Sequence, residues 1–321
     1  MAKITLKAVT RAQGSTEAVK DGTVRPQRYS LDFEEVPVLI QAFRRMVRTL
    51  DFDVSEMAIT TYLCAKSFGK PFTALPVFLV RGFHHGAIVR GTAARGPGAD
   101  IDSPKQLEGR RVGVSRGYTV TTGVWARGIL QDEYGVDLSR VTWAPSGDEH
   151  VAEYRAPGNV EPPPASKQDL AGSVAVGELA AAVGITADKP GLAPVIPDPD
   201  EAGFRALRER GLYPINHVLV VKDELLDAHP DLAADLFETY AEAKNRYVGR
   251  LRAGQIATPT PTDLMYRQVL GITGGDPLPY GIEPNQQMLA ELMRHAVTQR
   301  ILPEPIPLDV LFPAATLGLV G

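Results

Sequence analysis

Segments with the two-residue period of a strand alternate along this chain with segments of helical period, and that alternation limits the fold more than any other feature. Residues 3–9 alternate apolar and polar side chains, which predicts a strand. Residues 39–50 place apolar side chains at helical spacing, and helices also fit 57–68 and 119–134. The order predicts an α/β protein in which ligands bind at the carboxyl ends of strands.

The alternation is interrupted once, and the chain later returns to a strand. Residues 91–100 are small and rich in glycine, which predicts a flexible crossover, and "NHVLVV" at 216–221 is a clear strand before a mostly helical end. We therefore expect two α/β lobes, the first of them discontinuous: 1–95 with 213–321, and 96–212.

Composition excludes several classes of function. A net charge of −4 without a long basic block argues against nucleic acid as a partner. No apolar run reaches the roughly 18 residues of a membrane-spanning helix, so no membrane partner is expected. The single Cys64 excludes an internal disulfide and a thiolate metal cluster. Met1 is followed directly by a strand pattern, from which we expect a cytoplasmic protein.

The stretch "RGFHHGAI" places an arginine and two histidines between two strand-like runs. Histidine is the usual proton donor or acceptor at neutral pH, so His84 and His85 are candidate catalytic residues. Neighbouring strand residues face opposite ways, and we expect His85 to face the ligand and His84 to be structural, unless the turn breaks the alternation. Arg81 either binds a carboxylate through two hydrogen bonds or forms a surface ion pair.

A second candidate site lies at the start of the predicted helix, in "SRGYTVTTGVW". Gly117 ends a strand, and Thr119, Thr121 or Thr122 can cap the helix. The N–H groups of a helix N-terminus attract an anion, so these threonines and Tyr118 are candidate substrate contacts. The alternative is an ordinary capped helix without a ligand.

Three further candidates stand at strand ends. In "DVSEM", Ser55 is a candidate substrate contact, and Glu56 either orients a histidine, accepts a proton or caps the next helix. His217 follows "YPIN" at the return strand and is expected to face the ligand.

Arg127 is a full turn inside its helix, where we expect a surface or interlobe ion pair.

Several segments resemble the 4,5-dihydroxyphthalate decarboxylases, a family within the type 2 periplasmic-binding-protein superfamily. They are "FDVSEMAITTYLCAK", "FTALPVFLVRGFHHGAIV", "LEGRRVGVSRGYTVTTGVWARGILQDEYGVD" and "YPINHVLVV". The resemblance implies a two-lobed fold with a ligand cleft between the lobes. Two departures stand out: the loop at 10–24 lacks the acidic and aromatic pattern of the family, and Ala180 stands where an acidic residue is expected.

The resemblance implies conversion of 4,5-dihydroxyphthalate to protocatechuate and carbon dioxide, with a small aromatic carboxylate as substrate. No redox cofactor is expected; a divalent metal is the alternative, with Glu56, Asp148, Glu149 or His217 completing a site beside the histidines. A homo-oligomer is left open. The catalytic candidates are His85, His84 and Glu56, and the substrate-binding candidates are Arg81, Ser55, Tyr118, Thr119, Thr121, Thr122 and His217.

Two other functions use the same fold. A solute-binding protein for an aromatic carboxylate is the main alternative, and the "RGFHHGAI" segment favours the enzyme over it. A relative of the thiamine-pyrimidine synthases would carry a cysteine-rich segment, which a chain with one cysteine lacks.

Overall fold

The chain folds into two compact units, each built on its own sheet. The computed structural model describes residues 3–92, 101–165 and 168–321. Unit 1 comprises Met1–Gly82, Ile215–Ala290 and Ile306–Gly321, and unit 2 comprises Phe83–Pro214 and Glu291–Pro305.

The predicted α/β class is confirmed, and the division of the chain differs from the predicted lobes at two places. Residues 83–92 belong to unit 2 because the strand after the histidines pairs within the unit 2 sheet. Glu291–Pro305 also belong to unit 2, although they follow the return strand. Of the predicted flexible crossover, residues 93–100 lie outside the described residues.

The sheet of unit 1 has the strand order β2-β1-β3-β10-β4. β1 runs parallel to β2 and β3, whereas β10 runs antiparallel to both of its neighbours. This sheet contains the predicted first strand and the predicted return strand. Its strands are β1 (Ile4–Val9), β2 (Tyr29–Phe33), β3 (Val54–Ala58), β4 (Phe72–Arg81) and β10 (Ile215–Lys222).

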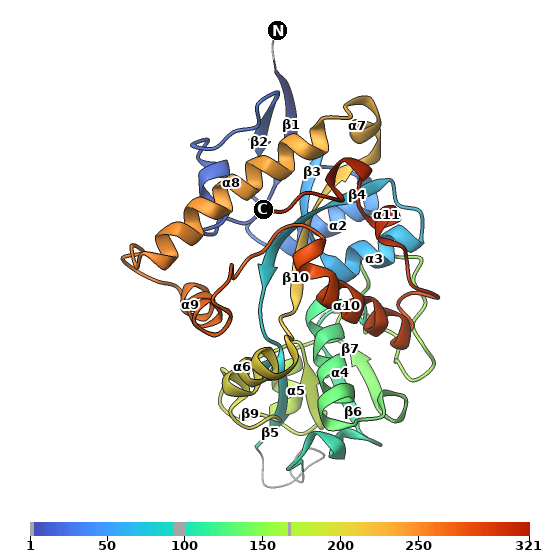
Figure 1. Cartoon of the computed structure of the whole chain (residues 1–321). Helices are drawn as coiled ribbons and strands as arrows, with labels where there is room; N and C mark the ends of the chain where they lie inside the picture. Colours follow the sequence, from blue (N-terminus) through green and yellow to red (C-terminus); the bar gives the residue numbers. More distant parts are fainter. Residues whose placement is uncertain (1–2, 93–100, 166–167) are drawn as a thin grey trace. The chain divides into compact units, whose positions relative to one another are not determined.

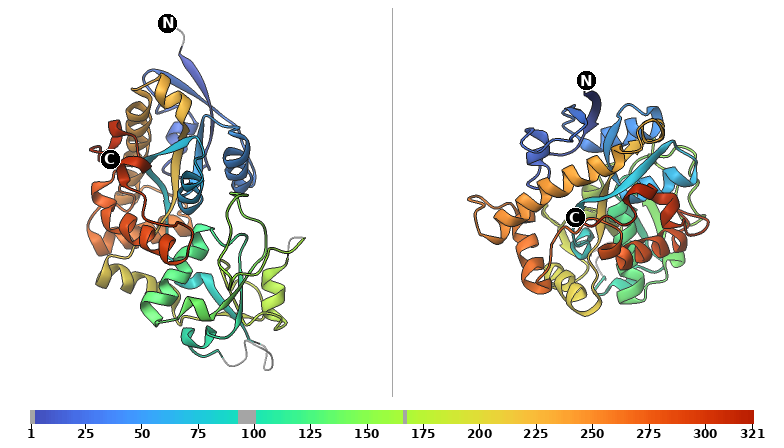
Figure 2. Two further views of the ribbon diagram at one scale, coloured as in Figure 1. Left: turned by 90° about the vertical axis from the view of Figure 1, so that its right-hand side faces the viewer. Right: turned by 45° about the horizontal axis from the view of Figure 1, so that its top comes forward.

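Helices cover both faces of the unit 1 sheet. Figure 2 (left) shows the blue helices α2 and α3 on one side of its strands and the orange α8 on the other. The strands β3 and β4 between them are almost wholly buried, as expected for strands covered on both faces. The helices are α1 (Glu17–Lys20), α2 (Leu39–Thr49), α3 (Ile59–Ser67), α7 (Asp223–Ala228), α8 (Leu232–Arg252), α9 (Pro261–Thr273) and α11 (Leu308–Leu311).

The sheet of unit 2 has the order β7-β6-β8-β5-β9. β6 is parallel to β7 and β8, and β5 is antiparallel to β8 and β9. The strands are β5 (Ile88–Gly91), β6 (Arg111–Val114), β7 (Thr142–Pro145), β8 (Ala181–Val183) and β9 (Leu192–Pro194). The helices are α4 (Thr121–Tyr134), α5 (Leu170–Ala175), α6 (Pro199–Arg210) and the part of α10 (Gln286–Thr298) from Glu291 onward, labelled in Figure 1.

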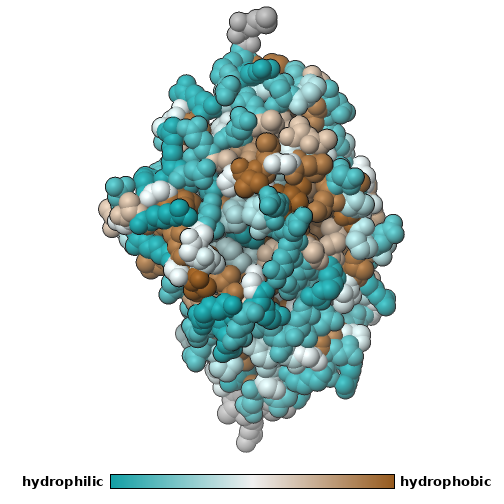
Figure 3. All heavy atoms as spheres, in the orientation of Figure 1, coloured by the Kyte–Doolittle hydropathy of each residue, from teal (hydrophilic) through white to brown (hydrophobic). Residues whose placement is uncertain are grey.

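The surface is mostly polar on the face drawn in Figure 3, where brown, apolar atoms gather over unit 1 between α8 and α11. Val310 and Val320 are exposed in this C-terminal part of the chain. Within the described residues, no helix combines the length and the apolar character needed to cross a bilayer.

Candidate active site

Two side chains from separate parts of unit 1, those of Arg11 and His217, meet at the carboxylate of Glu56. Glu56 lies on β3, directly opposite Leu219 of β10, and His217 lies two residues before Leu219. Residues two apart on a strand share a face, so Glu56 and His217 are diagonal neighbours on one side of the sheet. Arg11 follows β1, whose end pairs with Ser55 of β3. The sheet register thus joins three segments that are far apart in the sequence.

The carboxylate of Glu56 is completely buried and fully bonded. Oε2 accepts the backbone N–H of Arg11 at 2.9 Å, and Oε1 accepts the Nε–H of Arg11 at 2.8 Å. Oε1 also lies 2.5 Å from Nδ1 of His217. Burial alone would raise the pKa of Glu56. The hydrogen bond from His217 and the charges of His217 and Arg11 outweigh it, so that the pKa is lowered and Glu56 is ionised.

The ionised carboxylate fixes the orientation of the His217 ring. An ionised carboxylate only accepts hydrogen bonds, so Nδ1 of His217 carries the proton toward Glu56. The NH2 of Arg11 lies 3.1 Å from the same ring nitrogen, and the ring packs edge-on against Phe43 at 5.1 Å. Nε2 is then the ring nitrogen that does not face Glu56.

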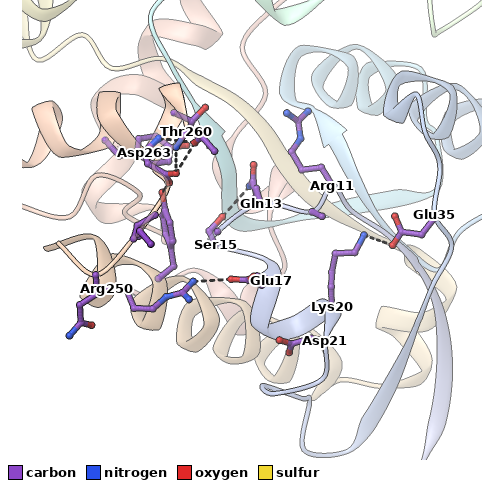
Figure 4. A pocket seen from close by; sticks show the side chains of 18 residues that line it. Arg11, Gln13, Ser15, Glu17, Lys20, Asp21, Glu35, Arg250, Thr260 and Asp263 are labelled. Carbon is purple, nitrogen blue, oxygen red and sulfur yellow. Dashed lines mark hydrogen bonds and ion pairs between the residues drawn. The ribbon is translucent and has the colours of Figure 1, made fainter. Parts of the chain in front are cut away.

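Arg11 also lines a cavity of about 900 Å³ that lies within unit 1. Figure 4 shows its walls, on which Lys20 is paired with Glu35 and Arg250 with Glu17. Gln13 is fixed there by hydrogen bonds from its Nε2 to Ser15 and to the carbonyl of Leu79. The volume is ample for a single aromatic ring with polar substituents. Arg11 therefore links this cavity to Glu56 and His217.

Arg81 ends β4 and is buried in unit 1 beside Ile215 of β10. Burial raises the pKa of Tyr266, a residue of the cavity wall, to about 12; the backbone of Arg81 and the charges of Arg81 and Arg11 oppose that rise. The positive charges of Arg81 and Arg11 thus both favour the ionised form of the Tyr266 phenol. Because the Arg81 side chain is buried, it does not form the surface ion pair that was the alternative prediction for it.

Ser55 faces away from Glu56, because the two are neighbours on one strand. It is fully buried, and its hydroxyl donates to the carbonyl of Glu56 at 2.8 Å. The structure therefore places Ser55 in the interior of the unit 1 sheet.

His84 and His85 belong to unit 2, where both are buried. The chain leaves β4 after Arg81 and forms a 3-10 turn over His85–Ala87, so the strand alternation breaks at this point. Nε2 of His85 lies 3.1 Å from both oxygens of Glu133 on α4, and Arg210 bonds the same carboxylate at 2.7 Å. The His85 ring is therefore directed at α4.

The segment that leads into α4 binds a carboxylate of the protein itself. Glu149 accepts the N–H of Tyr118 at 2.5 Å, the N–H of Thr119 at 3.2 Å and the hydroxyl of Thr119 at 2.6 Å. Gly117 permits this, because a Cβ there would lie 2.4 Å from Oε2 of Glu149. Burial raises the pKa of Glu149, although these hydrogen bonds oppose the rise. Glu149 thus binds the two N–H groups that directly precede the N-cap residue of α4.

The predicted threonine cap of this helix is wrong. Val120 is the N-cap residue, and within the described residues no side chain caps α4. The hydroxyl of Thr119 is used on Glu149 instead, Thr121 is buried in the first turn, and Thr122 is the next residue of that turn.

The predicted surface or interlobe pair for Arg127 is also wrong. Its side chain is fully buried in unit 2, with the guanidinium carbon 3.8 Å from the centre of the Tyr118 ring. Its Nε donates to Gln299 at 2.8 Å and its NH2 to the carbonyl of Tyr118 at 2.6 Å. Stacking and hydrogen bonds of this kind make a buried guanidinium tolerable.

Comparison with known proteins gives two relatives with a shared description. No family model matches this chain. A 4,5-dihydroxyphthalate decarboxylase from Comamonas testosteroni is 30% identical over 266 residues, which cover 78% of this chain and 78% of that protein. A 4,5-dihydroxyphthalate decarboxylase from Pseudomonas putida is 35% identical over 153 residues, which cover 45% of this chain and 56% of that protein.

Solved structures show the same fold. The periplasmic aliphatic sulphonate binding protein SsuA from Escherichia coli matches with a TM-score of 0.55 at 12% identity, over 97% of this chain and 91% of that one. At this identity the likeness concerns the fold alone, and it confirms the predicted periplasmic-binding-protein-like fold.

Proposed function

Because this chain belongs to the 4,5-dihydroxyphthalate decarboxylase family, we propose that it removes one carboxylate from 4,5-dihydroxyphthalate, giving protocatechuate and carbon dioxide. The single observation that supports a site for this reaction is the buried pair of Glu56 and His217, with Arg11 reaching from the pair into a cavity.

The reaction needs a proton donor at one ring carbon. Each carboxylate of the substrate has a hydroxyl para to it, and loss of the hydroxyl proton pushes electron density toward the carbon that carries the carboxylate. A proton joins that carbon, the bond to the carboxylate breaks, and the carboxylate leaves as carbon dioxide. The electrons of the broken bond remain in the new C–H bond, so no oxidant or reductant takes part.

We assign the proton transfer to His217 among the histidines predicted from the sequence. Glu56 holds Nδ1 of His217 and directs the ring so that Nε2 exchanges protons with the ligand. His85 is less suited, because its Nε2 is directed at Glu133. Arg11 and Arg81 are the cations for the carboxylate that stays on the ring, since guanidinium binds carboxylate through two parallel hydrogen bonds.

The test is incubation of the purified protein with 4,5-dihydroxyphthalate, with protocatechuate and carbon dioxide as the products measured. In the His217→Asn variant we expect turnover to fall by about 10²–10⁴-fold, the usual size of a general acid–base contribution. His229→Asn is the matched control, because His229 packs edge-on against Tyr29 outside this site and should leave turnover unchanged.

Two outcomes would contradict the proposal in different ways. Full turnover in His217→Asn would remove His217 from the proton transfer. Tight binding of 4,5-dihydroxyphthalate by the unmodified protein with no release of carbon dioxide would favour a solute-binding protein instead.

A further inference from the structure

We propose that Asp132, Glu291 and His295 form a binding site for a divalent transition-metal ion within unit 2, separate from the proposed decarboxylase site. Asp132 lies on α4, and Glu291 and His295 lie one turn apart on α10, beside α4 in Figure 1. The ligand atoms of the three side chains all lie within 4.8 Å of one another.

The spacing of these atoms fits a small ion. Nε2 of His295 lies 3.6 Å from Oδ2 of Asp132 and 3.8 Å from Oε1 of Glu291. Two ligands on a tetrahedral zinc ion are about 3.3 Å apart, given bonds of about 2.0 Å. The two distances from Nε2 of His295 are longer than this by only a few tenths of an ångström, and the two carboxylates lie within 4.8 Å of each other. One imidazole with two carboxylates is also a ligand set that zinc accepts.

His295 is the feature that points to a ligand rather than to an acidic surface alone. Its side chain is only 2% exposed, and its Nε2 is aimed between the two carboxylates. Both distances exceed hydrogen-bond length, and among the described residues Nδ1 has no hydrogen-bond partner. A metal ion between Nε2 and the two carboxylates would bind all three groups at a point where neither carboxylate is within hydrogen-bond distance of the ring.

Neighbouring residues fix the ring in this position. Trp125 packs against it edge-on at 5.5 Å. Gly128 of α4 lies under the ring, and a Cβ there would come within 2.5 Å of two ring atoms. The His295 ring therefore packs closely against Trp125 and Gly128 of α4, and its Nε2 is directed at Asp132 on the same helix.

Arg294 is the competitor for the ion. Its two terminal nitrogens lie 3.2 Å and 2.5 Å from the oxygens of Asp132, and one lies 3.9 Å from Glu291. Its side chain is half exposed, so it can leave the carboxylates without disturbing the core. Its positive charge lowers the affinity for a cation, and its removal should raise that affinity.

The experiment measures zinc bound by the whole purified chain, by titration calorimetry and by metal analysis after dialysis. We expect one zinc ion per chain and a higher melting temperature in its presence. Glu291→Gln should lower the affinity at least about tenfold, the size of effect seen for residues that support metal ligands. Arg294→Gln should raise it roughly fivefold, the effect of one unit charge at about 4 Å in water.

Matched controls come from the ion pair of Glu201 and Arg208 on α6, also in unit 2. Glu201→Gln and Arg208→Gln should leave zinc affinity unchanged. Cobalt(II) bound in place of zinc should give a visible spectrum that changes in His295→Gln. Should that variant not fold, Glu291→Gln carries the same test, because Glu291 is near the surface.

The proposal is overturned if the unmodified chain binds no zinc, or if Glu291→Gln binds it as tightly. Unchanged or weaker affinity in Arg294→Gln would also overturn it, since the ion would then lie elsewhere. None of these readouts depends on decarboxylase activity, so failure here is distinct from failure of the proposed function.

Discussion

Two buried arginines show how much the surroundings of a residue decide its role. Arg81 and Arg127 are both almost fully buried and were both expected to form ion pairs or bind a ligand. Arg127 is engaged within unit 2 by Tyr118 and Gln299, whereas Arg81 acts with Arg11 on a tyrosine of the cavity wall.

The two should therefore respond differently to truncation. Arg81→Ala should weaken substrate binding by roughly 2–5 kcal/mol, the cost of losing one partner of a buried charged contact. Arg127→Ala should instead lower the free energy of unfolding by about 3 kcal/mol, because it leaves buried acceptors unsatisfied. Michaelis constants and urea unfolding of both variants check this. A stable Arg127→Ala protein with a raised Michaelis constant would reverse the assignment.

At the scale of elements, the sequence predicts the helix α4 and the strand β10, but it does not predict which side chains the strands bring into contact. Periodicity places a helix at 119–134 and a return strand at 216–221, and both are confirmed as α4 and β10. The pairing of Glu56 with His217 depends on the register between β3 and β10, and no local pattern encodes a contact across 161 residues.

The contacts of Arg11 and Glu149 could not be predicted for the same reason. Arg11 lies in a loop whose pattern departs from the family, and only the parallel pairing of β1 with β3 brings it to Glu56. Glu149 follows β7 in "SGDEHV", and a carboxylate after a strand is its only signal in the sequence. Its role depends on the adjacent β6, whose end leads into α4.

The contact of Glu149 with the segment before α4 can be tested by adding one methyl group at Gly117. In Gly117→Ala the new Cβ would lie 2.4 Å from the Glu149 carboxylate and push it off the N–H groups of Tyr118 and Thr119. We expect the free energy of unfolding to fall by about 1–3 kcal/mol, the cost of unsatisfied buried groups. Gly158→Ala is the control, because a Cβ there meets nothing within 4 Å. Equal stability of the two variants would contradict the role of Gly117.

At the scale of the whole molecule, the buried charge of Glu56 links stability to pH. Its pKa in the folded protein lies below the ordinary value of 4.5. A lowered folded pKa means that the ionised group stabilises the protein above the unfolded pKa, and that this stabilisation is lost as pH falls through the folded pKa.

The Glu56→Gln variant measures that contribution. At pH 7 the variant should be less stable by about 3 kcal/mol, because Arg11 and His217 lose a buried charged partner. The difference should shrink as pH falls below 4.5 and through the lowered pKa of the folded protein. Urea unfolding of both proteins across this range is the measurement, and a difference that does not change with pH would show that Glu56 is not ionised when folded.

The division of unit 2 into two stretches has a consequence for synthesis on the ribosome. Gln299, which bonds the buried Arg127, follows it by 172 residues, and the whole of Ile215–Ala290 is made in between. While that segment emerges, Arg127 has no Gln299 to bond and the ring of His295 is not yet present beside Trp125. Most of unit 2 is therefore made well before its last stretch, Glu291–Pro305, is added, and a nascent chain stalled before Glu291 should expose this core to proteases.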